Sequence, residues 1–283
     1  MKLIRFGKTG TEKPGLWRDG RIVDLTAIFP GIPDIGETFF RDGWLEKVEK
    51  VDAPGVIMDI RIGCPVSRPG KIICLGKNYA EHARETGLEI PARPLLFCKT
   101  ANTLNGPFDP IRLPKSSTQI DWEVELAIVI GKEGRGITKE NAFTHIAGFM
   151  VFNDVSARDA QFSDGQWFRG KSFDTFAPAG PALVTPDEIG PPDSVRRLQL
   201  TTHVNGVLMQ DGNTRDMIFN LADIIADISE DITLTPGDII ATGTPSGVGF
   251  FRDPPLVLKA GDLVTCTIEK IGTIENRVLA VRC

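Results

Sequence analysis

One short segment constrains the fold more than any other, because it places two acids inside an otherwise apolar strand. Residues 122–130 read Trp-Glu-Val-Glu-Leu-Ala-Ile-Val-Ile, and successive side chains of a strand point to opposite faces. This alternation puts Glu123 and Glu125 on one face with Ala127 and Val129, and the larger apolar side chains on the other. Both acids therefore point together into a half-apolar surface, roughly 7 Å apart along the strand.

The acid pair has two physical explanations. Two ionised carboxylates at this spacing repel each other and are costly to desolvate, so a cation between them would stabilise the pair. Oxygen ligands of this kind suit Mg²⁺, Mn²⁺ or Ca²⁺. The alternative is a solvated strand face on which Glu123 and Glu125 pair with Lys or Arg of neighbouring strands, as surface acids commonly do.

Composition limits the classes of function. The 283 residues are 41% hydrophobic and 24% charged, which suits one large globular domain or a large domain with a small companion. A net charge of −5 without a basic run argues against a nucleic-acid partner. The chain shows neither a secretory signal nor an apolar run of membrane-spanning length, so we expect a cytoplasmic protein with no membrane partner. The five scattered cysteines predict ordinary buried thiols.

Turn and strand signals predict a division of the chain into two parts. Residues 2–25 read as short strands joined by an Asp19-Gly20 turn, and residues 65–70 read as a connector rich in proline. We therefore predict a small N-terminal β-rich domain over residues 1–64 and a larger domain over residues 70–283.

The larger part also reads as β-rich. Strands are expected at residues 71–75, 123–130, 148–152, 198–204, 238–241, 263–269 and 273–280. One long helix is expected, with Thr214 as its cap and an apolar stripe that extends to Ile228. Many strands with few helices, without βαβ alternation, indicate an α+β fold.

A third acid follows the strand expected at residues 148–152. Asp154 lies where this strand gives way to a helix, and strand ends of this kind are favoured places for ligands. It would complete an oxygen-ligand set with Glu123 and Glu125 and leave positions open for water and substrate. Taken alone, Asp154 is more often a helix cap.

Four further polar residues could contact an anionic substrate. Arg158 and Gln161 share a face of the helix that follows Asp154. Lys171 lies between aromatic residues, where an ammonium could stabilise an enolate. Thr244 lies in a glycine-rich stretch whose hydroxyl and amide groups could bind a carboxylate. The alternatives are solvated side chains for the first three residues and a plain turn for the fourth.

A candidate general base lies in residues 75–85. His82 and Glu85 fall three residues apart on one helical face, so the carboxylate can orient the imidazole and raise its basicity, as activation of water requires. Asn78 with Glu81 resembles a capping box for this helix. The alternative is a histidine on a helix surface.

Taken together, these segments resemble the fumarylacetoacetate hydrolase family. The resemblance runs from about Arg68 to Glu269 through residues 76–85, 94–99, 123–125, 152–159, 170–174 and 243–249. It implies a mixed β-sandwich roll with a small N-terminal β domain, a homodimer, and a divalent cation, Mg²⁺ or Mn²⁺. The implied metal ligands are Glu123, Glu125 and Asp154.

The resemblance also implies a small keto-acid substrate and roles for the matched residues. Lys171 is expected to stabilise the substrate's oxygen atoms, and His82 and Glu85 are expected to lie on a lid and activate water. The residues expected to bind substrate are Arg158, Gln161, Thr244, Lys99 and Tyr79.

The implied reaction is hydrolytic cleavage of the C3–C4 bond of a 2,4-diketo acid, which gives pyruvate and a carboxylic acid. The substrate would be a 2,4-diketo-3-deoxy sugar acid or an acylpyruvate. One alternative is a lyase on the same scaffold, such as an oxaloacetate decarboxylase or a ureidoglycolate lyase. The other is a calcium-binding module without activity, which would have no use for Lys171 or His82.

Overall fold

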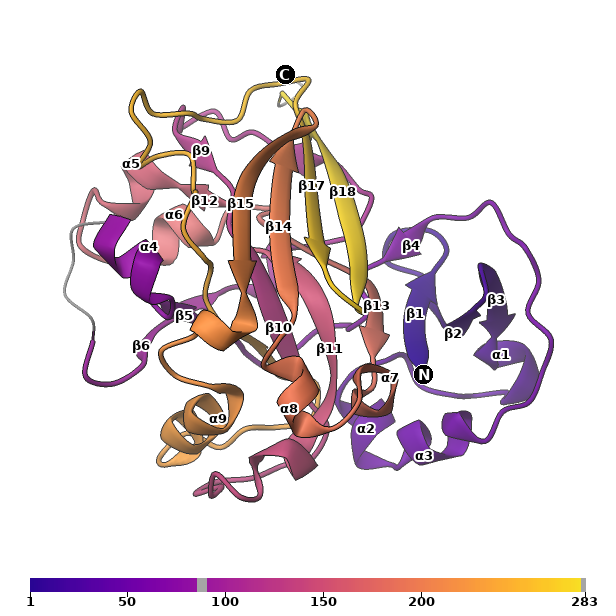
Figure 1. Ribbon diagram of the computed structural model, residues 1–283. Coiled ribbons are helices and arrows are strands. Elements are labelled where there is room, and N and C mark those ends of the chain that lie inside the picture. Colours follow the sequence, from indigo (N-terminus) through magenta and orange to yellow (C-terminus); the bar gives the residue numbers. More distant parts are fainter. Residues whose placement is uncertain (86–90, 281–283) are drawn as a thin grey trace.

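The fold is an α+β fold in which strands dominate, as predicted. The computed structural model describes residues 1–85 and 91–280, and Figure 1 shows two layers of strands with short helices around them. Within these residues, no helix is long and apolar enough to cross a membrane.

The main sheet has the strand order β3-β2-β1-β13-β11-β10-β16-β5-β6. These strands are β1 (Lys2–Phe6), β2 (Lys13–Arg18), β3 (Arg21–Asp24), β5 (Ile72–Gly76), β6 (Leu95–Lys99), β10 (Val124–Ile130), β11 (Ile146–Asn153), β13 (Ala177–Val184) and β16 (Ile239–Ala241). The short strands β4 (Ile62–Gly63) and β7 (Leu104–Asn105) pair with β1 and β13. Along the main path only β16 and β5 pair in parallel, so the sheet is mixed.

A second sheet packs face to face on the first. Its order is β15 (Val207–Asn213), β14 (Gln199–Val204), β17 (Leu263–Ile268), β18 (Gly272–Leu279) and β8 (Ile111–Arg112). Strands β14, β17 and β18 contact β10, β11 and β13 of the main sheet. A small third sheet pairs β9 (Ile120–Asp121) with β12 (Ser156–Ala157) beside the candidate site.

The helices are short and lie at the edges of the sheets (Figure 1). The α-helices are α1 (Leu25–Ile28), α2 (Glu37–Arg41), α3 (Trp44–Glu49), α4 (Ala80–Glu85), α5 (Arg158–Gln161), α6 (Phe168–Lys171), α7 (Pro186–Ile189), α8 (Pro192–Val195) and α9 (Leu221–Ser229). The 3₁₀ turns are η1 (Ala101–Thr103), η2 (Ala142–His145) and η3 (Thr214–Asp216).

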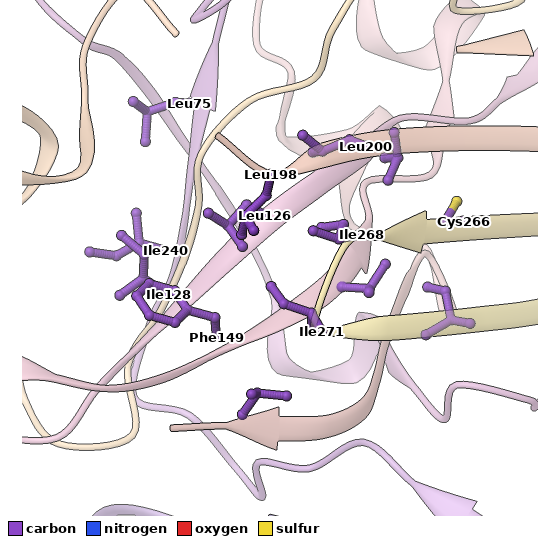
Figure 2. Close-up of a cluster of buried hydrophobic side chains, with 14 of the residues drawn as sticks. Leu75, Leu126, Ile128, Phe149, Leu198, Leu200, Ile240, Cys266, Ile268 and Ile271 are labelled. Atoms are coloured by element: carbon purple, nitrogen blue, oxygen red, sulfur yellow. The ribbon is translucent and has the colours of Figure 1, made fainter. Parts of the chain in front are cut away.

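Strand β10 separates two hydrophobic cores, which confirms the predicted alternation of its side chains. Leu126 and Ile128 belong to the core between the two sheets, and Figure 2 shows them in one cluster with Leu200 and Ile268. Ala127 lies in the other core, on the same face as the two acids. Burial of each large apolar side chain contributes about 2 kcal/mol, so the alternation fixes the strand register and with it the direction of the acids.

The predicted start of the long helix, with Thr214 as its cap, is wrong. Residues 214–216 form the turn η3, and α9 begins only at Leu221, where Asn220 and Asp223 form a capping box. The chain between them is held extended, because the Ile218 N–H donates to the Asn78 carbonyl at 2.7 Å. The tertiary contact and the better cap override the apolar stripe that predicted a longer helix.

Strand β13 is central and was absent from the predicted set. Its sequence, Ala-Pro-Ala-Gly-Pro-Ala-Leu-Val, contains two prolines and a glycine, which normally argue against a central strand. It pairs with β1 on one side and β11 on the other. Strands β1, β2 and β3 of the first 64 residues therefore continue the main sheet. The division of the chain into two domains near residues 64–70 stays a prediction.

Candidate active site

Three carboxylates meet where β10 begins and β11 ends. Antiparallel pairing sets Glu125 opposite Phe152, and the backbone N–H of Asp154 donates to the Glu123 carbonyl at 2.9 Å. One carboxylate oxygen from each of Glu123, Glu125 and Asp154 lies within 4.8 Å of the other two. All three side chains are buried, so the solvated strand face considered as an alternative is wrong. Asp154 is not a helix cap either, since Ala157 occupies the N-cap position of α5.

Buried cations compensate two of the three acids. The Lys171 ammonium donates to Glu123 Oε2 at 2.8 Å and to Asp154 Oδ2 at 2.7 Å. Arg158 Nη2 lies 2.6 Å from Glu123 Oε1. Burial opposes ionisation of Glu123, but the charges of Lys171 and Arg158 hold its pKa well below the ordinary value. Glu123 is therefore ionised at neutral pH.

Glu125 lacks such a partner. Its Oε2 accepts the Gly243 N–H at 2.8 Å, and no Lys or Arg in the described part of the chain forms an ion pair with it. Burial, together with the charges of Asp154 and Glu123, raises the pKa of Glu125 well above its ordinary value. The cluster therefore lacks one positive charge at a place where three carboxylate oxygens converge. This donor set fits a hard divalent cation such as Mg²⁺ or Mn²⁺.

A fourth buried acid, Asp121, holds the guanidinium of Arg158. Arg158 Nε and Nη2 both donate to Asp121 Oδ2, at 2.9 and 2.8 Å. Asp121 also accepts the Gly249 and Phe250 backbone N–H groups, at 2.7 and 3.0 Å. Sequence reasoning missed this residue, although Asp121 continues the two-residue alternation of Glu123 and would have been found by starting the pattern one position earlier.

His82 and Glu85 form the predicted pair on α4. The imidazole Nδ1 lies 3.1 Å from Glu85 Oε2, and the Gly247 N–H donates to Glu85 Oε1 at 3.1 Å. With Nδ1 engaged by the carboxylate, Nε2 is the ring nitrogen left to exchange a proton with a ligand. His82 lines the same cavity as Glu123 and Glu125.

The Asn78 side chain does not form the predicted capping box of α4, because it bonds to distant backbone groups instead. Its Nδ2 donates to the carbonyls of Phe219 and Thr242 at 3.0 and 2.8 Å, and its Oδ1 accepts the Phe219 N–H at 2.8 Å. Asn78 therefore ties the start of α4 to two distant segments. The neighbouring Tyr79 is buried, and its hydroxyl has no hydrogen-bond partner in the described structure.

Both polar and aromatic side chains line the cavity. The polar lining includes Glu123, Glu125, Arg158, Lys171 and Thr244. The aromatic lining consists of Phe97, Phe162, Trp167 and Phe251, and the Lys171 ammonium lies 5.0 Å from the centre of the Phe97 ring. Such a cavity can bind the charged head of a small acid and pack its carbon chain against the rings.

The predicted substrate ligands divide into two groups. Arg158, Gln161 and Thr244 line the cavity together with Lys171, and their contact with substrate stays a prediction. Lys99 and Tyr79 do not line it. The Lys99 ammonium instead donates to Asp154 Oδ1 at 2.5 Å and to the Val155 carbonyl at 3.1 Å, behind the acid cluster. Their contact with substrate stays a prediction, and the structure places the Lys99 ammonium where it holds Asp154.

The Thr244 hydroxyl is already occupied by protein groups. It donates to the Val124 carbonyl at 2.9 Å and accepts from Gln210 Nε2 at 2.8 Å. Gln210 Oε1 in turn accepts the Val124 N–H at 3.0 Å. Gln210 thus joins β15 to the start of β10 and to the Thr244 loop, and no sequence pattern connects these positions.

Comparisons with known proteins show which family the chain belongs to. A family profile described as fumarylacetoacetate (FAA) hydrolase C-terminal matches residues 71–279. A 2,4-didehydro-3-deoxy-L-rhamnonate hydrolase of Sphingomonas sp. (strain SKA58) is 46% identical over 281 residues, covering 98% of this chain and 96% of that protein. The mitochondrial oxaloacetate tautomerase FAHD2B of Bos taurus is 44% identical over 291 residues, covering 99% of this chain and 92% of that protein.

Comparison with solved structures finds similarity to the same family. The fumarylacetoacetate hydrolase of Exiguobacterium antarcticum superposes with a TM-score of 0.84 at 39% identity, covering 99% of this chain and 100% of that one. The fold and the matches define an enzyme that acts on keto acids. The chain belongs to the fumarylacetoacetate hydrolase family.

Proposed function

We propose that the protein is a divalent-metal-dependent hydrolase that cleaves a 2,4-diketo acid to pyruvate and a carboxylic acid. The observation that carries this proposal is one cavity lined both by the acids Glu123 and Glu125 and by the base His82. A purely structural calcium site would need no base, so this pairing supports an enzyme over a calcium-binding module. Mg²⁺ or Mn²⁺ is the proposed cofactor, with Glu123, Glu125 and Asp154 as its ligands.

The side chains provide the remaining chemistry. When bound, the cation acts as a Lewis acid that stabilises negative charge on the oxygen atoms of a keto acid. His82 Nε2 takes a proton from water, whose oxygen attacks C4 of the substrate, while Glu85 keeps the imidazole oriented. The electron pair of the C3–C4 bond passes to the pyruvate fragment as an enolate, which Lys171 and Arg158 stabilise by charge. Protonation of C3 by His82 then returns the base.

A second candidate is proton transfer or carbon dioxide loss on oxaloacetate, without attack by water. It is supported by the 44% identity to a protein named oxaloacetate tautomerase. In tautomerisation, His82 would move a proton between C3 and the C2 oxygen. In loss of carbon dioxide, the electron pair of the C3–C4 bond would pass to the pyruvate enolate, and His82 would then donate a proton to C3. Lys171 and Arg158 would stabilise the enolate in both reactions.

Product analysis distinguishes the candidates. We expect the purified protein with Mg²⁺ to convert acetylpyruvate or a 2,4-diketo-3-deoxy sugar acid to pyruvate and the matching carboxylic acid, detected by mass. Oxaloacetate and ureidoglycolate complete the panel. Rapid turnover of oxaloacetate without cleavage of any diketo acid would refute the hydrolase and support the second candidate.

The proposal extends to organisation and location. We propose a homodimer in which residues 1–64 form the small N-terminal part and residues 70–283 the catalytic part, and a cytoplasmic location in the cell. Light scattering of the purified protein tests the dimer.

A further inference from the structure

Lys99 is a second buried ammonium on Asp154, and it does not face the cavity. Its Nζ donates to Asp154 Oδ1 at 2.5 Å and to the Val155 carbonyl at 3.1 Å, and its side chain is completely buried. Asp154 already receives the Lys171 ammonium on its other oxygen, Oδ2, at 2.7 Å. Lys171 lines the cavity, whereas Lys99 does not. Lys99 therefore acts on a ligand in the cavity through Asp154 and through its charge.

Hydrogen bonding alone does not explain why this group is a lysine. Desolvation of a buried ammonium costs several kcal/mol, and buried charged groups can often be replaced by apolar side chains without loss of stability. Lys71, which pairs with the buried Asp238 at 2.7 Å, avoids this cost because its side chain is 33% exposed. Burial lowers the pKa of Lys99, and the charge of Asp154 opposes that shift. The buried positive charge is therefore the property that needs a function.

The charge balance of the acid cluster depends on Lys99. Within the described residues, the cluster and its direct partners are the four buried acids Asp121, Glu123, Glu125 and Asp154 and the three buried cations Lys99, Arg158 and Lys171. With these groups charged and His82 neutral, the net charge is −1, and a divalent cation held by the three carboxylates would change it to +1. Without Lys99, the same ion would bring the net charge only to 0.

We propose that Lys99 is a positioning residue that sets the charge of the site, so that it weakens binding of the divalent cation and strengthens binding of the anionic keto acid. The ammonium repels a cation held by Asp154, because both bind to the same carboxylate. The same charge leaves the metal-loaded cluster positive, which attracts the carboxylate of a keto acid. This inference rests on the proposed function, in which Glu123, Glu125 and Asp154 hold the ion beside the keto acid.

Two dissociation constants, measured on variants of Lys99 by titration calorimetry at one pH, test this role. The first is the Kd of Mg²⁺, and the second is the Kd of pyruvate at saturating Mg²⁺. Lys99→Gln keeps a hydrogen-bond donor for Asp154 and removes the charge. We expect it to bind Mg²⁺ about tenfold more tightly and pyruvate about tenfold more weakly than the unmodified protein. Lys99→Met should shift both constants in the same directions, and Lys99→Arg should restore both.

A neutral ligand and a second lysine provide the controls. Pyruvamide has nearly the size of pyruvate without its charge, so its affinity should not change in Lys99→Gln. Lys71→Met removes the lysine from a buried acid outside the cavity and should change neither Kd. Thermal unfolding shows which variants fold, and Lys99→Met replaces Lys99→Gln if the latter does not. Loss of folding in both neutral variants would assign Lys99 to stability and overturn its proposed role.

The remaining outcomes separate the role of Lys99 from the proposed reaction. Shifts of both Kd values in the same direction, as a merely structural residue would give, would overturn the role, and so would the absence of any shift. Failure of the unmodified protein to bind Mg²⁺, or pyruvate in its presence, would overturn both the proposed site and this inference. Binding that responds as expected, without hydrolysis of any diketo acid, would overturn the reaction alone.

Discussion

Replacing Glu125 by Gln should change stability in opposite directions without and with metal. Glu125 is 1% exposed, and one of its oxygens lies within 4.8 Å of oxygens of Glu123 and Asp154. At an effective dielectric constant near 20, two like charges about 5 Å apart repel by about 3 kcal/mol. Lys171 and the neighbouring cations offset part of this repulsion. The amide of Gln keeps an oxygen for the Gly243 N–H. It also removes the cost that Glu125 bears without metal, which is either repulsion of its buried charge or uptake of a proton at its raised pKa.

In excess chelator, we therefore expect Glu125→Gln to be about 1 to 2 kcal/mol more stable than the unmodified protein, which raises Tm by about 2 °C for each kcal/mol. With Mg²⁺ at about 100 times its Kd, the unmodified protein should gain about 2.7 kcal/mol, or about 5 °C. The variant should gain almost nothing, because it lacks a ligand of the ion. The order of the two melting temperatures should reverse when metal is added.

Differential scanning calorimetry with chelator and with a Mg²⁺ series measures both effects. Glu49→Gln, at an exposed position of α3, is the matched control and should change stability by less than about 0.5 kcal/mol in either condition. An equal Mg²⁺ shift in Glu125→Gln and the unmodified protein would refute the assignment of Glu125 as a ligand. A large loss of stability in chelator would refute the account of its buried charge.

Four further predictions concern other side chains. His82→Ala should lower kcat about 100- to 10,000-fold at unchanged metal content by mass spectrometry, whereas His203→Ala, the control, should keep full activity; equal losses would contradict a role for His82 as base. Asp121→Asn should raise KM about tenfold with a smaller change in kcat, because it weakens the hold on Arg158, and a kcat effect alone would refute this positioning role. Cys98 is exposed and should react within minutes with a thiol reagent at pH 8, a reaction that Cys98→Ser removes. Burial raises the pKa of Cys64 to about 11, so this thiol stays protonated below that pH and should react only after unfolding; rapid native-state labelling of Cys64, located by peptide mapping, would contradict this.

The convergence of Glu123, Glu125 and Asp154 was predictable from the sequence, because it depends on the alternation of side chains along neighbouring strands. In β10 the side chains of Glu123 and Glu125 share a face wherever the strand lies, and Asp154 follows the next strand in an antiparallel pair. The His82 pair was equally accessible, since both of its members lie within one helical turn. These features depend on spacing of a few residues, which the sequence displays directly.

Features set by distant contacts were not predictable in the same way. Lys99 was expected to touch substrate, but its ammonium turns to Asp154, 55 positions further along the chain. The cysteines were expected to be buried, yet Cys98 is exposed because it alternates with Lys99 on β6. Gln210 reaches the start of β10 only through the packing of the second sheet on the first. Nothing within a few residues of these positions specifies such contacts.

The pairing of β1 with β13 has a consequence for anyone who wishes to shorten this enzyme. Deleting the first 64 residues would remove β1, the pairing partner of Leu183 and Val184, and would make β13 an exposed edge strand. Exposed edge strands pair with strands of other chains, so the truncated protein should aggregate as it is produced. Shortening the chain at exposed loop tips would leave β13 paired with β1.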